Sequence, residues 1–249
     1  MTRGRALQKR AYFRLPKNEA RLTNFFSRFF FVSCGLETVY YLLPPINALS
    51  PPRHDTKLPE AKVFQFTIQA QTGVSGGAFE VLGTQIYYRI YKQWEKIDSV
   101  ASSMSSLNNS STSNFEAAER LKNSYNYKVM WFKNGSSQSE LVFPDTTANI
   151  RIRLMKFTSE FPAEIVQNGG ASMGIPIRFE GKNDFDFWKN ADSEPKNGEA
   201  DFEDASRFSS GYENIYFVDL YATTIGIDET LREYSSAVLH LGTVAISKP

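Results

Sequence analysis

Strict alternation of apolar and polar side chains predicts two long strands early in the chain. In residues 63–70 every even position is apolar, and three of the four odd positions are Gln or Thr. A period of two is typical of a strand with one buried face. Gly73 and Gly76-Gly77 then predict a turn. Residues 79–92 follow, with a second alternating run at 86–91.

The period then changes to that of a helix. Apolar residues recur at helical spacing after Trp94, and the Ser/Asn-rich run 105–113 interrupts them. Ser113 and Glu116 have the spacing of a capping box, which predicts a second short helix. Residues 94–125 are therefore expected to form a helical insertion between strands.

Shorter segments predict the remaining strands. Asn134-Gly135 is a typical hairpin turn and follows the candidate strand 127–133. Further candidate strands cover residues 140–143, 150–154, 163–167, 176–179, 215–224 and 236–247. Many short strands separated by turns favour a mainly β fold. We expect one β-sandwich over residues 61–249, with the helical insertion at 94–125 and a long acidic loop at 180–212.

The end of the chain resembles a known class of sandwich. Residues 216–221 and the apolar strand 238–246 are similar to the final two strands of a fibronectin type III or immunoglobulin-like domain. The resemblance implies a sandwich fold. It implies no ligand, because such sandwiches host many functions.

Charge is distributed unevenly along the chain. Residues 1–33 contain eight Lys/Arg and one Glu, a net charge of +7, whereas the rest contains 20 Lys/Arg against 26 Asp/Glu, a net charge of −6. A folded part with this charge argues against a general nucleic-acid binder, since phosphate contacts need clustered Lys/Arg. The sequence has no run of 18 apolar residues, which argues against a membrane-spanning helix.

Cys34, the only cysteine of the chain, follows the basic stretch and a short apolar run at 25–33. A basic stretch, an apolar stretch, a small residue (Ser33) and a cysteine resemble the precursor of a spirochaete-type bacterial lipoprotein. The resemblance implies that residues 1–33 are an export signal and that Cys34 carries the lipid, a palmitate-type acyl group. It also implies anchoring in the bacterial cell envelope, on the periplasmic or surface side. Two alternatives stay open: a small buried hydrophobic Cys34 and an Arg-rich organelle transit segment.

Residues 34–60 are predicted to form a Pro-rich tether. Pro44-Pro45, Pro51-Pro52 and Pro59 remove backbone donors and favour extended structure. The aromatic patch at 39–43 is an exception. We expect it either to pack on the domain as a first strand or to lie at a membrane interface, where Tyr is favoured.

The sequence has few side chains of the types that usually serve in catalysis. His54 lies in the Pro-rich segment, and His240 lies in the last strand, on a predicted face with Val238, Val244 and Ile246. A lone His in an apolar strand is typically a packed residue. The sequence lacks a P-loop and a dinucleotide-binding glycine pattern. We therefore predict no catalytic residue and no cofactor.

The acidic segment 180–204 offers the main alternative chemistry, with nine acidic against three basic residues. Paired carboxylates support glycoside hydrolysis, and oxygen-rich side chains bind Ca²⁺, although the spacing of an EF-hand loop is missing. We expect a solvated loop whose aromatic residues tie it to the sheet, without a metal. The carboxylates of the catalytic alternative are Asp184, Asp186, Asp192, Glu194, Asp201, Glu203 and Asp204. Candidate metal ligands among them are Asp184, Asp186, Asp201, Glu203 and Asp204.

Aromatic residues are dense around the helical insertion: Tyr87, Tyr88, Tyr91, Trp94, Tyr125, Tyr127 and Trp131. Such residues serve binding surfaces, but their place in predicted strands favours the core.

The sequence thus predicts an exported, lipid-anchored cell-envelope protein with a non-enzymatic binding or structural role. The expected partners are the membrane, through Cys34, and a protein or glycan of the envelope, without nucleic acid. One alternative is a carboxylate-dependent carbohydrate-active or Ca²⁺-binding protein that uses residues 180–204. The other is a non-exported protein whose basic arm contacts nucleic acid or a membrane surface.

Overall fold

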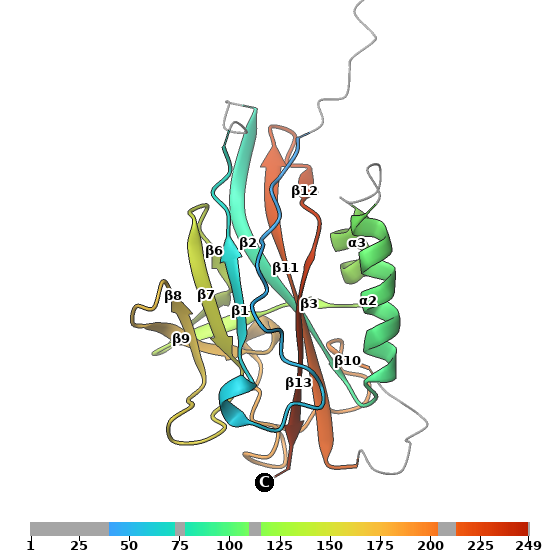
Figure 1. Cartoon of the computed structure of the whole chain (residues 1–249), viewed down its shortest axis with the longest axis vertical. Coiled ribbons are helices and arrows are strands. Elements are labelled where there is room, and N and C mark those ends of the chain that lie inside the picture. The colour runs from blue at the N-terminus through green and yellow to red at the C-terminus, as the bar shows by residue number, and fades with distance from the viewer. Residues whose placement is uncertain (1–39, 73–77, 110–115, 204–212, 249) are drawn as a thin grey trace, which may run out of the picture. The chain divides into compact units, whose positions relative to one another are not determined.

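The strands β2 (Phe79–Tyr91) and β11 (Ile215–Asp228) pair antiparallel at the centre of the structure, from Tyr91 opposite Phe217 to Phe79 opposite Asp228. The computed structural model describes residues 40–72, 78–109, 116–203 and 213–248, and its compact unit begins at Tyr40. In this unit two mostly antiparallel sheets stack as a β-sandwich, and helices cover one outer face (Figure 1). The predicted mainly β fold is confirmed.

The central pair belongs to a sheet that we call the inner sheet. On the β11 side lie β12 (Glu233–Ser235) and β13 (Leu239–Ser247), both antiparallel to β11. Three two-residue strands lie along the other edge of β2: β3 (Lys128–Val129), β6 (Val142–Phe143) and the parallel β10 (Phe202–Glu203).

The second sheet, the outer sheet, has the strand order β1-β7-β8-β9-β4-β5. Its strands are β1 (Phe64–Ile68), β7 (Ala148–Arg153), β8 (Glu164–Gln167), β9 (Ser172–Ile177), β4 (Trp131–Asn134) and β5 (Ser137–Glu140). β1 follows its predicted alternation, because Phe64, Phe66 and Ile68 are buried and the residues between them are half-buried.

The chain changes sheets at a pair of buried residues. The short strands β3 and β4 flank Met130, whereas β5 and β6 flank Leu141, whose backbone N–H donates to the Met130 carbonyl (2.8 Å). The candidate strand 140–143 is therefore divided: Glu140 ends β5, which pairs with β4 across the predicted Asn134-Gly135 turn, and Val142–Phe143 pairs with β2.

Helices α2 (Glu95–Asn108) and α3 (Glu116–Asn123) form the predicted helical insertion. They cover the face of the inner sheet that points away from the outer sheet (Figure 1). Ile97, Val100 and Met104 of α2 pack with Tyr87 and Tyr91 of β2. Ser113 of the predicted capping box lies outside the described residues. None of the helices in the described residues is both long and apolar enough to cross a bilayer.

The Pro-rich segment packs on the domain over its described residues, 40–60. The Leu43 carbonyl accepts hydrogen bonds from Thr224 Oγ1 (2.8 Å) and Gln71 Nε2 (3.0 Å). Ile46 forms a bridge with Thr67 of β1, and the Pro52 carbonyl accepts from the backbone N–H of Thr243 in β13 (2.8 Å). These contacts reach both sheets. The predicted tether is thus corrected here to a packed strap, which leads into the short helix η1 (Pro59–Ala61).

The acidic loop contributes to the core of the sandwich. Phe185 and Phe187 are fully buried, and their rings pack against Tyr88 and Tyr216, with centroids 5.1 and 5.3 Å apart. The loop follows the short helix η2 (Phe179–Gly181). Residues 204–212 of the predicted loop lie outside the described residues.

We predict that Gly83→Ala destabilises the fold by at least about 2 kcal/mol. Gly83 has a φ of +125°, and an added Cβ would lie 2.1 Å from the carbonyl oxygen of Phe143. Gly135, at φ +60° with open space around it, provides the control. Gly135→Ala introduces backbone strain without a steric clash and should lower the free energy of unfolding by about 1 kcal/mol. Urea unfolding compares the two, and equal losses would contradict the close approach of β2 and β6.

Candidate functional site

The acidic segment is fixed to the sandwich by a buried ion pair. Arg178 and Asp201 are 1% and 0% exposed. Arg178 Nε donates to Asp201 Oδ2 (2.7 Å), Nη2 donates to Oδ1 (2.6 Å), and Nη2 also bonds Glu199. This bidentate arrangement matches the planar guanidinium group to the two carboxylate oxygens. Asp201, a candidate metal ligand, is therefore covered by a cation.

Tyr88 completes this buried cluster from β2. Its hydroxyl donates to Asp201 Oδ2 (2.6 Å) and accepts from the backbone N–H of Phe179 (2.9 Å). Burial, and then the neighbouring Asp201 carboxylate, raise the pKa of Tyr88 well above its ordinary value. The phenol therefore stays protonated, so that it can donate to Asp201 at neutral pH.

Most other carboxylates of the segment also have polar partners. Asp184 pairs with Lys189 (2.8 Å), and Asp192 pairs with Lys196 (2.9 Å). Glu194 accepts from the hydroxyl of Tyr216 (2.6 Å), whereas Glu203 is bound by Arg89 and Lys96. The backbone N–H of Asp186 donates to Asp184 Oδ1 (3.1 Å).

Asp204 and the lipidation candidate Cys34 lie outside the described residues.

These contacts spread the candidate carboxylates over several separate pairs. Among the described residues, the structure has no group of three or more His, Cys, Asp or Glu side chains placed to hold a metal ion. A carboxylate that acts as an acid, base or ligand has to be reached by a substrate or ion. Asp201 and Glu203 are instead engaged by Arg178 and Arg89, which tie the segment to the fold.

A second polar cluster lies between the inner sheet and the helices, centred on Asp219 of β11. Asp219 is fully buried. Its Oδ2 accepts from the hydroxyl of Tyr127 (2.6 Å), and its Oδ1 accepts from Thr243 Oγ1 (2.7 Å). His240 Nε2 lies 2.7 Å from the same Oδ1. A buried carboxylate needs such partners because desolvation of the unpaired charge is costly.

A break in the strand pairing brings His240 to this cluster. Leu220 is opposite Gly242, whereas the next residue, Tyr221, is opposite His240, so Leu241 is an extra residue in β13. His240 and Thr243 consequently reach the same carboxylate. The predicted face is corrected in part. Val238 packs on the helix side, where His240 stacks on Tyr221 (4.7 Å between ring centroids), whereas Val244 and Ile246 belong to the core between the sheets.

Electrostatics favour the charged form of His240. Burial opposes the imidazolium, but the Asp219 carboxylate outweighs burial and raises the pKa of His240 above its ordinary value. Asp98 on α2 acts in the same direction. Burial and Asp219 also raise the pKa of Tyr127, which stays neutral as a donor. At mildly acidic pH the cluster is thus a buried ion pair supported by two hydroxyl donors.

The Asp219–His240 pair has the components of an acid–base dyad. The side chain of His240 is 37% exposed and that of Asp219 is 0% exposed, so solvent reaches only the imidazole of the pair. Triad-type catalysis also needs a nucleophile that donates to the His. The nearby Thr243 hydroxyl donates to Asp219 instead. The contacts therefore favour an anchor that joins β11, β13 and Tyr127.

Sequence reasoning missed Asp219. The available signal is a single carboxylate inside the apolar run of β11, which indicates a buried charge that needs partners. The other histidine, His54, stacks on Trp94 with ring centroids 4.3 Å apart and 3° between the planes. It thereby fixes the strap near the start of α2.

Comparisons with known proteins give no further guide: no family model, curated protein or solved structure matches the chain.

We predict that Arg178→Met destabilises the protein by about 3–5 kcal/mol, because it leaves the buried Asp201 carboxylate without its cation. Adding Asp201→Asn should recover part of this loss, since the uncompensated charge is then removed. Lys196→Met, which breaks the exposed pair with Asp192, is the control and should change stability little. Denaturant unfolding measures all four proteins, and a double variant no more stable than Arg178→Met would contradict the assignment.

We predict that His240→Gln removes a pH-dependent part of the stability. The folded pKa of His240 lies above the unfolded value of about 6.5. Its contribution is therefore fully present below pH 6.5 and is lost as pH rises through the folded pKa. The difference in stability between wild type and the variant should be largest at about pH 5.5 and smallest above the raised pKa of His240. Thermal unfolding across pH, with His54→Gln as control, tests this; a pH-independent difference would refute the ion pair.

Proposed function

We propose that the protein is exported and held at a bacterial membrane by a lipid on Cys34, where its β-sandwich has a non-enzymatic binding or structural role. The observation that carries the proposal is the order of a basic stretch, an apolar stretch, Ser33 and Cys34. The proposed partner of the sandwich is a protein or glycan of the envelope.

The start of the compact unit supports a short anchor. Tyr40 lies six residues after Cys34. Six residues of any conformation span at most roughly 20 Å, since an extended chain gains about 3.3–3.6 Å per residue. Because the strap at 40–60 is packed on the sheets, it adds no reach. A lipid on Cys34 would therefore hold the sandwich close to the bilayer.

The site contacts support binding over catalysis. The buried carboxylates Asp201 and Asp219 hold elements of the fold together through Arg178, Tyr127 and His240. Substrate chemistry at either carboxylate would have to break bonds that stabilise the sandwich. A stable sandwich carried near a membrane instead suits a protein that presents surfaces to a partner.

We predict that Cys34→Ser releases the protein from the membrane fraction of the cells that produce it. In wild type, intact mass should show loss of residues 1–33 and addition of acyl groups to Cys34. More than one acyl chain is expected, because a single chain anchors a protein only marginally.

Ser33→Ala keeps a small residue before the cysteine and is the matched control, which should remain in the membrane fraction. A wild-type chain recovered from the cytosol with residues 1–33 present and a free thiol would overturn the proposed function.

A further inference from the structure

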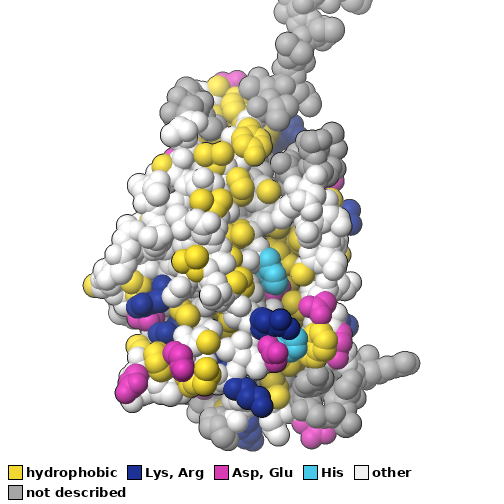
Figure 2. Space-filling view, in the orientation of Figure 1, with side chains coloured by type: hydrophobic (Ala, Val, Ile, Leu, Met, Phe, Trp, Pro, Cys, Tyr) yellow, Lys and Arg dark blue, Asp and Glu magenta, His cyan; other side chains and the backbone are white. Residues whose placement is uncertain are grey.

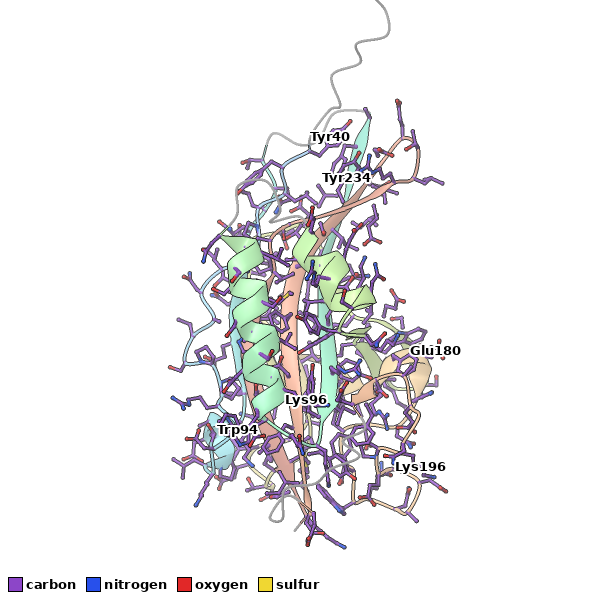
Figure 3. All side chains as sticks on the ribbon, turned by 90° about the vertical axis from the view of Figure 1, so that its right-hand side faces the viewer. Tyr40, Trp94, Lys96, Glu180, Lys196 and Tyr234 are labelled. Carbon is purple, nitrogen blue, oxygen red and sulfur yellow. The ribbon has the colours of Figure 1, made fainter. Side chains whose placement is uncertain are left out.

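One end of the sandwich carries a cluster of aromatic side chains. The ring of Tyr40 stacks on Phe79 (4.2 Å between centroids) and meets Tyr234 edge-on (5.4 Å), and Phe79 also contacts Tyr234 (5.7 Å). Figure 3 shows Tyr40 and Tyr234 together at this end. We call Tyr40, Tyr41, Phe79, Leu231 and Tyr234 the aromatic end. It joins the first described residues to the start of β2 and the β11–β12 turn.

The aromatic end exposes apolar side chains to solvent. Leu231 is 77% exposed and Tyr41 is 63% exposed. Figure 2 shows hydrophobic side chains on the surface at the upper end of its view, and others continue down the middle of the same face. Large exposed apolar side chains that gather at one end mark an interaction surface more often than single scattered ones do.

The turn that presents Leu231 is built from specific hydrogen bonds. Asp228 Oδ1 accepts from the backbone N–H of Thr230 (2.8 Å), from its hydroxyl (2.6 Å) and from the backbone N–H of Arg232 (3.0 Å). Asp228 Oδ2 accepts from the hydroxyl of Tyr234 (3.0 Å). Leu231 itself has a φ of +63°, a conformation that leucine rarely adopts. Strained residues of this kind concentrate where they serve a function.

Charge around the aromatic end limits the nature of its partner. Asp228, Glu229 and Glu233 lie in or beside the turn, and Glu80 lies beside Phe79. The cations at these residues are Arg232 in the turn and Lys122, which pairs with Glu233. This balance disfavours attraction to an anionic surface. Tyr and Leu side chains, by contrast, enter the interfacial layer of a bilayer with little need of charge.

We propose that the aromatic end rests on the membrane that holds the lipid of Cys34, with Leu231 and Tyr41 inserted between zwitterionic headgroups. The inference rests on the proposed lipid anchor. Its structural support is that the compact unit begins within the aromatic end, at Tyr40, only six residues after Cys34. With a reach of roughly 20 Å at most, the anchor would bring this end to the bilayer before any other part of the sandwich.

The single cysteine allows a direct test on the full chain. The Cys34 thiol is coupled to a maleimide lipid in vesicles of zwitterionic phosphatidylcholine, which replaces the acyl anchor. Leu231→Trp and, separately, Tyr41→Trp place a reporter in the aromatic end. Leu58→Trp is the matched control, because Leu58 is also an exposed leucine (61%) but precedes η1 near the opposite end of the domain (Figure 1). The wild-type chain gives the background from its own tryptophans.

Brominated phosphatidylcholine should quench the reporters at 231 and 41, and their emission should shift to shorter wavelength. The reporter at 58 should show neither change. Quenching that is equal at 231 and 58, or absent at 231, would overturn the docking while leaving lipidation of Cys34 untouched. A thiol that does not couple would instead overturn the proposed function, because an acyl acceptor has to be accessible.

Discussion

The fold depends on burying both faces of the β2–β11 pair. Side chains alternate along these strands, so Tyr88 and Val218 enter the core between the sheets, whereas Tyr87 and Tyr221 enter the core beneath the helices. A sheet covered on both faces has no room for solvated side chains. A buried polar group that the sequence places in β2 or β11 therefore needs a partner inside the protein, and this requirement explains the positions of both polar clusters. Within the described residues, Thr84 Oγ1 and the Tyr221 hydroxyl are buried without such a partner.

Each cluster connects the central pair to an element that is distant in sequence. Tyr88 of β2 reaches Asp201, and through it Arg178, so the acidic segment is fixed to the sandwich. Asp219 of β11 reaches Tyr127, which follows α3, so the helical layer is fixed to the opposite face. Buried ion pairs of this type contribute little net stability but penalise the loss of either partner. They specify how the layers fit together.

Local patterns predicted the elements whose environment is simple. The strand at 63–70 has one buried face, so its alternation was sufficient, and the helical spacing after Trp94 marked α2 because one side of that helix packs on the sheet. The rest depends on distant contacts. Nothing near Pro44 or Pro51 signals that the strap bonds to Thr224 and Thr243. The extra residue at Leu241 likewise changes the face of His240, and no local pattern predicts where a strand gains a residue.

The packed strap determines how closely a lipid on Cys34 would hold the domain. A free tether of some 25 residues would let the sandwich turn in any direction above a membrane, so no surface would be favoured by the anchor. With the strap bonded to both sheets, a lipid on Cys34 would be linked to the domain only by the residues between Cys34 and Tyr40, and it would attach at one end of the domain. A short link at one end restricts the orientation of the domain even before any contact forms. An exposed Leu231 at that same end would then need only a small additional interaction with the bilayer to fix the orientation, because the proposed anchor would already have offset most of the entropy of association.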